Sequence, residues 1–83
     1  MTALNLEIIS PTGIIFKGTC HMAVVPSVEG EMGVMFGHEA VVAALGQGQI
    51  GIYDDKQNLV KTFDVTSGFA EVGENKLLVL LDS

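Results

Sequence analysis

Three side chains in this sequence are of the types that ligate metals: Cys20, His21 and His38. Thiolate and imidazole groups suit zinc, but a structural zinc site uses four such ligands, mostly in closely spaced pairs. Cys20 and His21 are adjacent, and adjacent side chains on a strand point to opposite faces. The sequence therefore argues against a metal centre and favours Cys20 as a small core residue.

Two carboxylates and one serine are the candidates for catalytic chemistry. Glu29 and Glu31 are close enough in sequence to form an acid and base pair, but they lie on either side of Gly30, which favours an exposed loop tip. Ser67 lacks the G-x-S-x-G frame of a nucleophile elbow. The sequence predicts no catalytic site and no cofactor.

Glycines at positions 30, 33 and 37 resemble the spacing of a phosphate-binding loop. Such loops need a helix N-terminus or a lysine to meet the anion, whereas the charges here are negative. Sharp turns are the better interpretation of these glycines.

Asp54, Asp55 and Lys56 follow one another in an expected hairpin turn. Lipoyl and biotinyl carrier domains are small, acidic, all-β proteins that present a modified lysine in such a turn. Against this alternative, the glycines do not divide the chain into two matching halves. The carrier domain remains the second hypothesis for function.

The charge balance limits the partners. The chain has 83 residues with ten acids, four lysines and no arginine, for a net charge of −6. Binding to a phosphate backbone or to an anionic membrane needs clustered Lys and Arg, so neither nucleic acid nor a membrane surface is an expected direct partner. The N-terminus has no basic segment before an apolar run, and the longest apolar stretches, 40–45 and 77–81, are far shorter than the roughly 20 residues of a membrane span.

The elements that would position these side chains are short strands. Leu4, Leu6 and Ile8 alternate with polar residues, which is the period of a half-buried strand. A long or broken strand is expected over 14–25, with a bulge or bend at Gly18 and an end at Pro26. Further strands are expected over 50–53 and 59–65, and over 69–72 and 76–81. Turn residues separate them at short intervals, so the sequence predicts one all-β sandwich or barrel domain.

Two segments are harder to interpret. Residues 38–45 combine helix-forming Glu and Ala with two valines, and either a short helix or an extended stretch fits them. Residues 27–37 carry Met32, Val34, Met35 and Phe36 among glycines, more large apolar side chains than a small core readily absorbs. An exposed apolar rim for a protein partner is expected, and an internal cap on the sandwich is the alternative.

The run 29–38 resembles the hallmark of ATP synthase epsilon subunits: E-G-E, an apolar residue, G, further apolar residues, then G-H. The similarity extends to the segments 6–11, 15–18, 66–72 and 77–82, so it covers nearly the whole chain in order. Two departures occur: Ala40 stands where the family usually has proline, and the stretch 66–69 lacks or shifts one of two usual glycines.

This resemblance implies a flattened ten-stranded β-sandwich over residues 1–83, without a catalytic site of its own. It implies a rotor subunit in the central stalk of the proton-translocating ATP synthase, at the cytoplasmic face of the bacterial inner membrane. By the family pattern the gamma subunit would meet Ser10, His38 and Ala43. The polar loops of the c-ring would meet the residues Glu29, Gly30, Glu31 and Met32.

Longer family members continue past the sandwich into a two-helix hairpin. The sequence ends at Ser83, directly after its last expected strand. A short family member and one part of a longer protein are both compatible with this.

Overall fold

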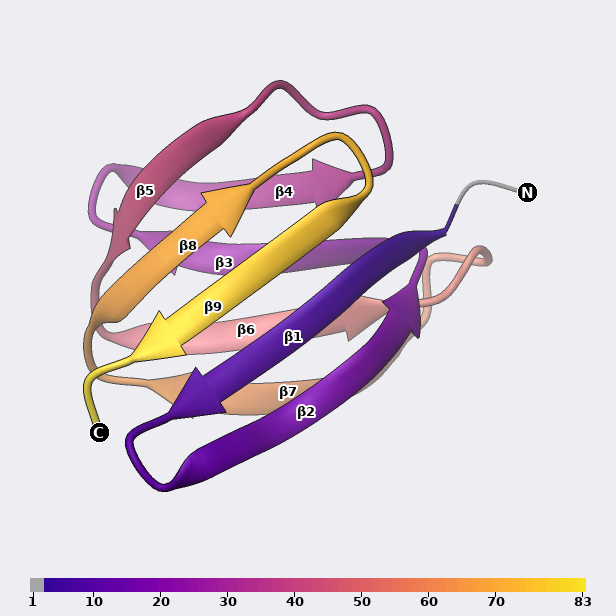
Figure 1. Ribbon diagram of the computed structural model, residues 1–83. Helices are drawn as coiled ribbons and strands as arrows, with labels where there is room; N and C mark the ends of the chain where they lie inside the picture. The colour runs from indigo at the N-terminus through magenta and orange to yellow at the C-terminus, as the bar shows by residue number, and fades with distance from the viewer. Residues whose placement is uncertain (1–2) are drawn as a thin grey trace.

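The computed structural model describes residues 3–83 and shows nine strands arranged in two layers (Figure 1). The first layer contains β1 (Leu4–Ser10), β2 (Gly13–Cys20), β5 (Val41–Leu45), β8 (Gly68–Val72) and β9 (Lys76–Leu81). The second layer contains β3 (Met22–Ser27), β4 (Gly30–Met35), β6 (Gly48–Tyr53) and β7 (Leu59–Val65). The all-β sandwich is confirmed, with nine strands in the described residues where the resemblance implies ten.

Hydrogen bonding follows the order β2-β1-β9-β8-β5 in the first layer and β3-β6-β7 in the second, with β4 on the other edge of β3. Neighbours are antiparallel except β1 and β9, which are parallel. The two layers join where Ser27 of β3 pairs with Leu45 of β5. The chain is thus one sheet bent over on itself.

The core lies between the layers. Period-two alternation directs Leu4, Leu6 and Ile8 of β1 inward, and all three are buried. Buried side chains on the facing layer include Ala23, Val25, Val34, Ile50 and Ile52. The fold therefore places one side of every layer in the core and leaves the other side to the surroundings.

Several expectations from the sequence need correction. The segment 14–25 is broken rather than one long strand, and the break is at His21 instead of Gly18. The irregularity in the pairing of β1 and β2 lies between Ile14 and Phe16, which pair with Ile9 and Ile8. Gly18 pairs regularly with Leu6, so the bulge is not at Gly18. Pro26 lies inside β3, which continues to Ser27. Residues 41–45 form strand β5, so the extended alternative is the one the structure adopts.

Gly68 tests how closely two strands approach. A Cβ atom added there would overlap the carbonyl oxygen of Leu80 on the neighbouring strand β9. Gly68→Ala should lower the free energy of unfolding by about 1–3 kcal/mol, the usual cost of forcing extra volume into a packed site. Urea denaturation measures this change.

The matched control is Gly73→Ala in the β8–β9 turn, where the nearest atom to an added Cβ is the Lys76 carbonyl oxygen at 4.0 Å. This variant should be neutral or more stable by up to about 1 kcal/mol, because alanine has less freedom to lose than glycine. Equal stability of the two variants would contradict the close approach at Gly68.

Candidate functional site

The outer side of the first layer carries a row of apolar side chains across all five strands. Cross-strand pairs connect Ala44 to Phe69, Phe69 to Leu80, Leu80 to Ile9 and Ile9 to Ile14. Phe69 is 53% exposed and Leu80 45%, while Ile9 and Ala44 are half-buried. These five residues, termed the apolar row below, form a continuous apolar surface, which on a small protein usually marks an interface.

A second row beside it is mixed. Val42 pairs with Glu71, Glu71 with Leu78, Leu78 with Glu7 and Glu7 with Lys17. Charged and apolar side chains therefore alternate next to the apolar row. Apolar residues in the middle with polar residues around them are the usual composition of a protein–protein contact.

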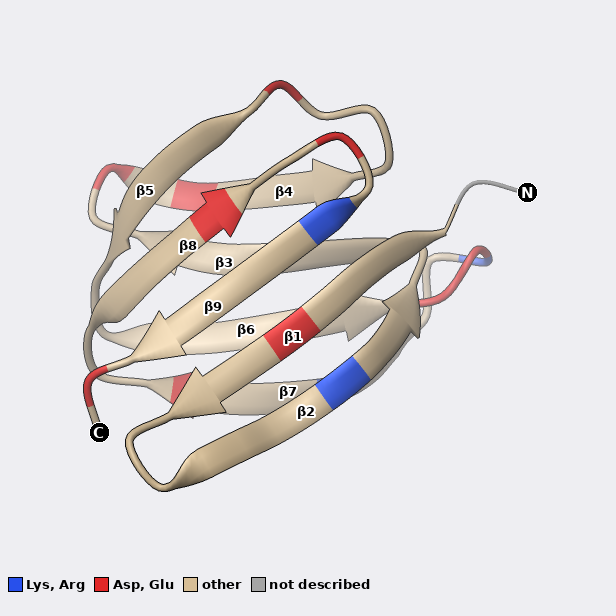
Figure 2. Cartoon of the chain, viewed as in Figure 1, with Lys and Arg blue, Asp and Glu red and all other residues tan. Residues whose placement is uncertain are grey.

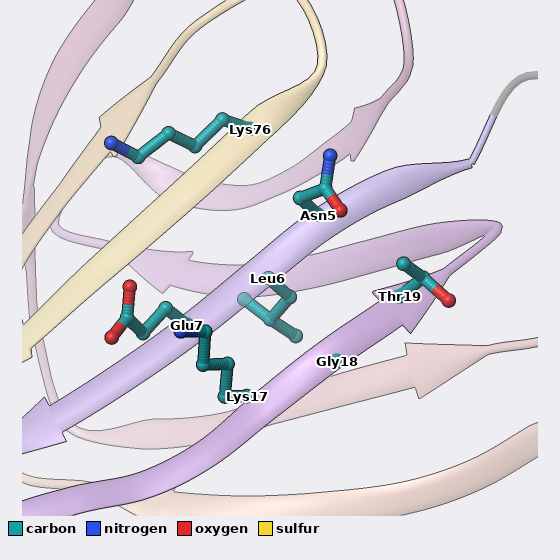
Figure 3. A pocket seen from close by; sticks show the side chains of 7 residues that line it. All are labelled: Asn5, Leu6, Glu7, Lys17, Gly18, Thr19 and Lys76. Atoms are coloured by element: carbon teal, nitrogen blue, oxygen red, sulfur yellow. The ribbon is translucent and has the colours of Figure 1, made fainter.

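A shallow depression of about 210 Å³ lies at the border of this face, between the starts of β1 and β9 and the end of β2. Its lining includes Asn5, Thr19, Lys17 and Lys76. Figure 3 shows the Lys17 side chain directed toward Glu7, whereas Lys76 extends away from Asn5 and Thr19. Because the two ammonium groups do not converge, the depression is part of the outer face rather than a separate anion site.

The β3–β4 turn forms an exposed tip at one end of the sandwich. Ser27 pairs with Gly30, and the Ser27 hydroxyl donates to the Gly30 carbonyl at 2.6 Å and accepts from the Glu29 amide at 3.2 Å. Gly30 has a φ of 124°, a region that disfavours any side chain. Glu29 and Glu31 are both exposed, so the tip is tightly turned and doubly acidic.

Acidic residues are spread widely over the molecule. Figure 2 shows them in the turns at both ends of the sandwich, while lysines are few. The β3–β4 tip is therefore distinguished by its tight geometry and by two acids separated by one glycine, and not by acidity alone.

The expected apolar rim in 27–37 is only half right. Val34 is fully buried at 0% exposure and Met32 packs against the core, because they pair with the inward residues Ala23 and Val25 of β3. Met35 and Phe36 are exposed. The alternative of an internal cap on the sandwich is therefore correct for Met32 and Val34, and the exposed rim is correct for Met35 and Phe36.

The three residues that the resemblance assigns to gamma are not neighbours. Ser10 is fixed in the β1–β2 turn, where its hydroxyl meets the Thr12 hydroxyl at 3.0 Å. His38 is in the β4–β5 loop, with Nδ1 at 2.7 Å from the Glu39 carbonyl, at the opposite corner of the sandwich (Figure 1). Ala43 is paired with the buried Ala70, so it lies on the inner side of β5.

The metal-ligand candidates lie in different surroundings. Cys20 is half-buried against the core, and this burial raises the pKa of its thiol. His21 links β2 to β3, and its amide donates to the Tyr53 carbonyl at 3.1 Å. Across residues 3–83 there is no group of three His, Cys, Asp or Glu side chains placed to bind a metal ion.

The β6–β7 loop is organised by Asp54, with Lys56 exposed at its tip. Asp54 Oδ1 accepts hydrogen bonds from the amides of Lys56 and Asn58, both at 2.9 Å. The bond from the Asn58 amide has the largest effect and lowers the pKa of the Asp54 carboxyl. Desolvation is the next largest effect and opposes it, while the Lys56 amide, the Asn58 side chain and His21 each lower the pKa further. This loop is a hydrogen-bonded turn that one carboxylate holds in place.

Sequence reasoning missed the apolar row. The signal was available in 77–81, where five successive apolar residues leave no polar side on the strand. A strand in a two-layer sandwich normally alternates, so apolar residues in both phases indicate that its outer side is covered by a partner. Ile9, Ile14 and Phe69 could not be added without knowing which strands are neighbours.

The five-stranded outer face and the acidic tip are two separate candidate contact surfaces on one β-sandwich. The sequence model described as "ATP synthase, Delta/Epsilon chain, beta-sandwich domain" matches residues 3–83. The chain belongs to this family, and the resemblance to epsilon subunits is confirmed. The family differs from the lipoyl and biotinyl carriers of the second hypothesis.

Curated relatives agree with this assignment. The ATP synthase epsilon chain of Campylobacter fetus subsp. fetus is 39% identical over 99% of this chain and 63% of its own length. That of Caldicellulosiruptor saccharolyticus is 35% identical over 100% of this chain and 59% of its own length. The chain thus spans about three fifths of the relatives it matches.

Solved structures share the fold. A chain of the Euglena gracilis mitochondrial ATP synthase, from a structure of OSCP, F1 and c-ring, superposes with a TM-score of 0.88 at 21% identity, covering 100% of this chain and 52% of that one. A chain from the central stalk and c-ring of the Tetrahymena thermophila enzyme gives 0.74 at 13% identity, covering 96% and 63%. Within residues 3–83, no helix is long and apolar enough to cross a membrane.

Acid titration should release the β6–β7 loop. Because folding lowers the pKa of Asp54, its stabilising effect is present above the ordinary aspartate pKa of about 3.9 and is lost as pH falls through the lower, folded value. The NMR signals of the Lys56 and Asn58 amides should therefore shift with a midpoint below about 3.9. Asp54→Asn should remove this transition, and a midpoint at or above the ordinary value would contradict the assignment.

Proposed function

We propose that this chain is the β-sandwich part of an epsilon-type rotor subunit, which connects the gamma subunit to the c-ring of a proton-translocating ATP synthase. It contributes no catalytic group and transmits force between proton flow and ATP synthesis. The observation that carries the proposal is the apolar row, an exposed apolar surface that crosses five strands of the domain. Family membership supports the ATP synthase as the complex in which such a surface would be covered.

The gamma subunit is the partner proposed for the outer face of the first layer. Phe69 and Leu80 are at its centre and are about half exposed, with Glu71 and Glu7 in the neighbouring row. Large apolar side chains at the centre of an interface contribute most of its binding energy. Ser10 and His38 lie near two corners of this face, and Ala43 acts from beneath it by packing rather than by direct contact.

The c-ring is the partner proposed for the tip Glu29, Gly30 and Glu31, with Met32 anchoring the tip on the core. The tight turn at Gly30 leaves both carboxylates exposed at this end of the sandwich. A doubly acidic tip is complementary to a polar loop that carries a basic residue. Contact with the membrane is then indirect, through the ring, at the cytoplasmic face of the bacterial inner membrane.

A charge placed at the centre of the apolar row should prevent gamma binding. Phe69→Glu buries an unpaired carboxylate in the contact, which should weaken the affinity for purified gamma subunit by at least about a hundredfold, or 2.7 kcal/mol. Because Phe69 is exposed, the thermal midpoint of the free domain should change little. Calorimetric titration and thermal melting measure the two quantities.

Leu59→Glu is the matched control. Leu59 is also 53% exposed, but it is on β7 of the second layer. This variant should bind gamma like the wild type. The gamma assignment to the first layer is wrong if Leu59→Glu binds as weakly as Phe69→Glu, or if Phe69→Glu binds normally.

Reversing the charges of the tip should impair coupling. In the Glu29→Lys, Glu31→Lys double variant, attraction to a basic ring loop becomes repulsion, and like charges across an interface can cost several kcal/mol. Proton-driven ATP synthesis in reconstituted vesicles should fall at low salt and recover as salt rises, because the Debye length is about 10 Å at 0.1 M and 3 Å at 1 M. Gamma binding should remain normal.

The control reverses two acids at the other end of the sandwich, with Asp55→Lys in the β6–β7 loop and Glu74→Lys in the β8–β9 turn. It changes the net charge equally and should leave synthesis unchanged. Equal loss in both double variants would point to net charge alone and remove the tip from the ring contact.

A further inference from the structure

Strand β5 has an edge that is almost entirely unpaired. Val41 to Leu45 pair along their whole length with β8 on one side. On the other side, the pairing within residues 3–83 is limited to the end of the strand, where Leu45 meets Ser27 of β3. Most of this edge therefore has no paired strand among the described residues.

The backbone groups that point to this edge can be identified. The Ala44 carbonyl accepts from the Val28 amide at 2.9 Å, so the polar groups of Ala44 face away from β8. In an antiparallel ladder alternate residues bond to the same neighbour, so Val42 has the same orientation as Ala44. The amide and carbonyl of Val42 and the amide of Ala44 are thus directed toward the free side.

A groove runs beside these groups. It has a volume of about 280 Å³ and lies between β5 and the β3–β4 hairpin. Its apolar lining includes Val28, Met32, Val41 and Val42, and Val42 is 66% exposed. An unpaired edge next to an apolar groove is the arrangement that binds an extended peptide as an added strand.

The other free edges of the sheet are protected against such pairing. β2 carries Lys17 and a register shift, β7 carries Lys61 and a register shift, and β4 carries Glu31. Charges and bulges on edge strands are devices that prevent the addition of another strand. The sequence of β5, Val-Val-Ala-Ala-Leu, contains no charge, proline or glycine.

The two open sides of the sandwich also differ. Between β2 and β7 the rings of Phe16 and Phe63 pack with centroids 5.5 Å apart, and the Lys61 ammonium lies 5.5 Å from the Phe63 ring. That side is closed by side chains. Between β4 and β5 the groove stays open.

We propose that the free edge of β5 binds an extended segment of a partner protein, with apolar residues at alternate positions and Lys or Arg at its ends. The apolar residues would fill the groove, and the backbone would pair with Val42 and Ala44. Basic ends are complementary to Glu29, which lines the groove, and to Glu71, which pairs with Val42. A second copy of this chain fits poorly, since its net charge is −6 and its own edge has the same acids.

The test uses the 83-residue chain and the acetylated, amidated peptide Lys-Val-Thr-Val-Thr-Val-Lys. NMR titration should move the Val42 and Ala44 amides most, and amide exchange at these two positions should slow at least about fivefold on saturation. The Val41 and Ala43 amides, already paired with β8, should change little. No response at β5 up to about 2 mM peptide, or a response at the edge of β2 or β7, overturns the proposal.

Two control peptides test the backbone pairing and the charge complementarity separately. Methylating the valine amides removes the backbone donors and should abolish binding. Replacing the terminal lysines with glutamates should weaken binding at least about tenfold. Equal binding by either control overturns the proposed mode.

Variants of the chain complete the test. Val42→Pro removes one edge amide at a position where proline is tolerated, and it should weaken peptide binding at least about tenfold. Val42→Ala keeps the amide and should weaken peptide binding at most about threefold.

Sedimentation of the free chain should show a monomer. A dimer formed through β5 would make a second copy the occupant and overturn the proposal. Ala44 belongs both to the apolar row and to this groove, whereas Phe69 and Leu80 belong to the row alone. Loss of gamma binding in Phe69→Glu with unchanged peptide binding, and loss of peptide binding in Val42→Pro, therefore distinguish the two proposals.

Discussion

The alternation of β1 and its parallel neighbour β9 is the constraint on which the core and the outer face of the first layer depend. Leu6 pairs directly with Leu77, and Ile8 pairs with Val79. All four side chains are buried. Because side chains alternate along a strand, the residues between them must face outward, and these include Leu78 and Leu80. A slip of one residue would put the whole buried set into water, so the outer face is fixed as firmly as the core.

Local chemistry made much of the fold predictable. The turn at Pro11 and Gly13, the β6–β7 loop and the β8–β9 hairpin each follow from turn residues between alternating stretches. The acidic tip was also predictable, since a glycine between two acids in a polar stretch favours a tight exposed turn. These features depend on residues that are close in sequence. Family resemblance added the sandwich topology, which no local pattern contains.

The errors arose where distant residues decide the outcome. Met32 and Val34 look like an exposed rim among glycines, yet pairing with Val25 and Ala23 directs them into the core. The register shift in β2 lies between Ile14 and Phe16, because these two residues pair with the adjacent residues Ile9 and Ile8 of β1. The apolar row was not predictable as a unit, since its five members come from five strands. Pairing between distant strands is information that the alternation of a single strand does not carry.

The link between the layers determines how force could pass through the domain. If the outer face of the first layer and the β3–β4 tip bind different partners, the hydrogen-bonded crossing from β5 to β3 is one path for load between them, beside the packed core. That crossing consists of the Ser27–Leu45 pair and hydrogen bonds from Val28 to Ala44 at 2.9 Å and from Gly46 to Pro26 at 2.8 Å. The crossing is only a few residues long, but it lies directly behind the tip. An added strand on β5 would border this junction, so it would stiffen the place where the sheet bends.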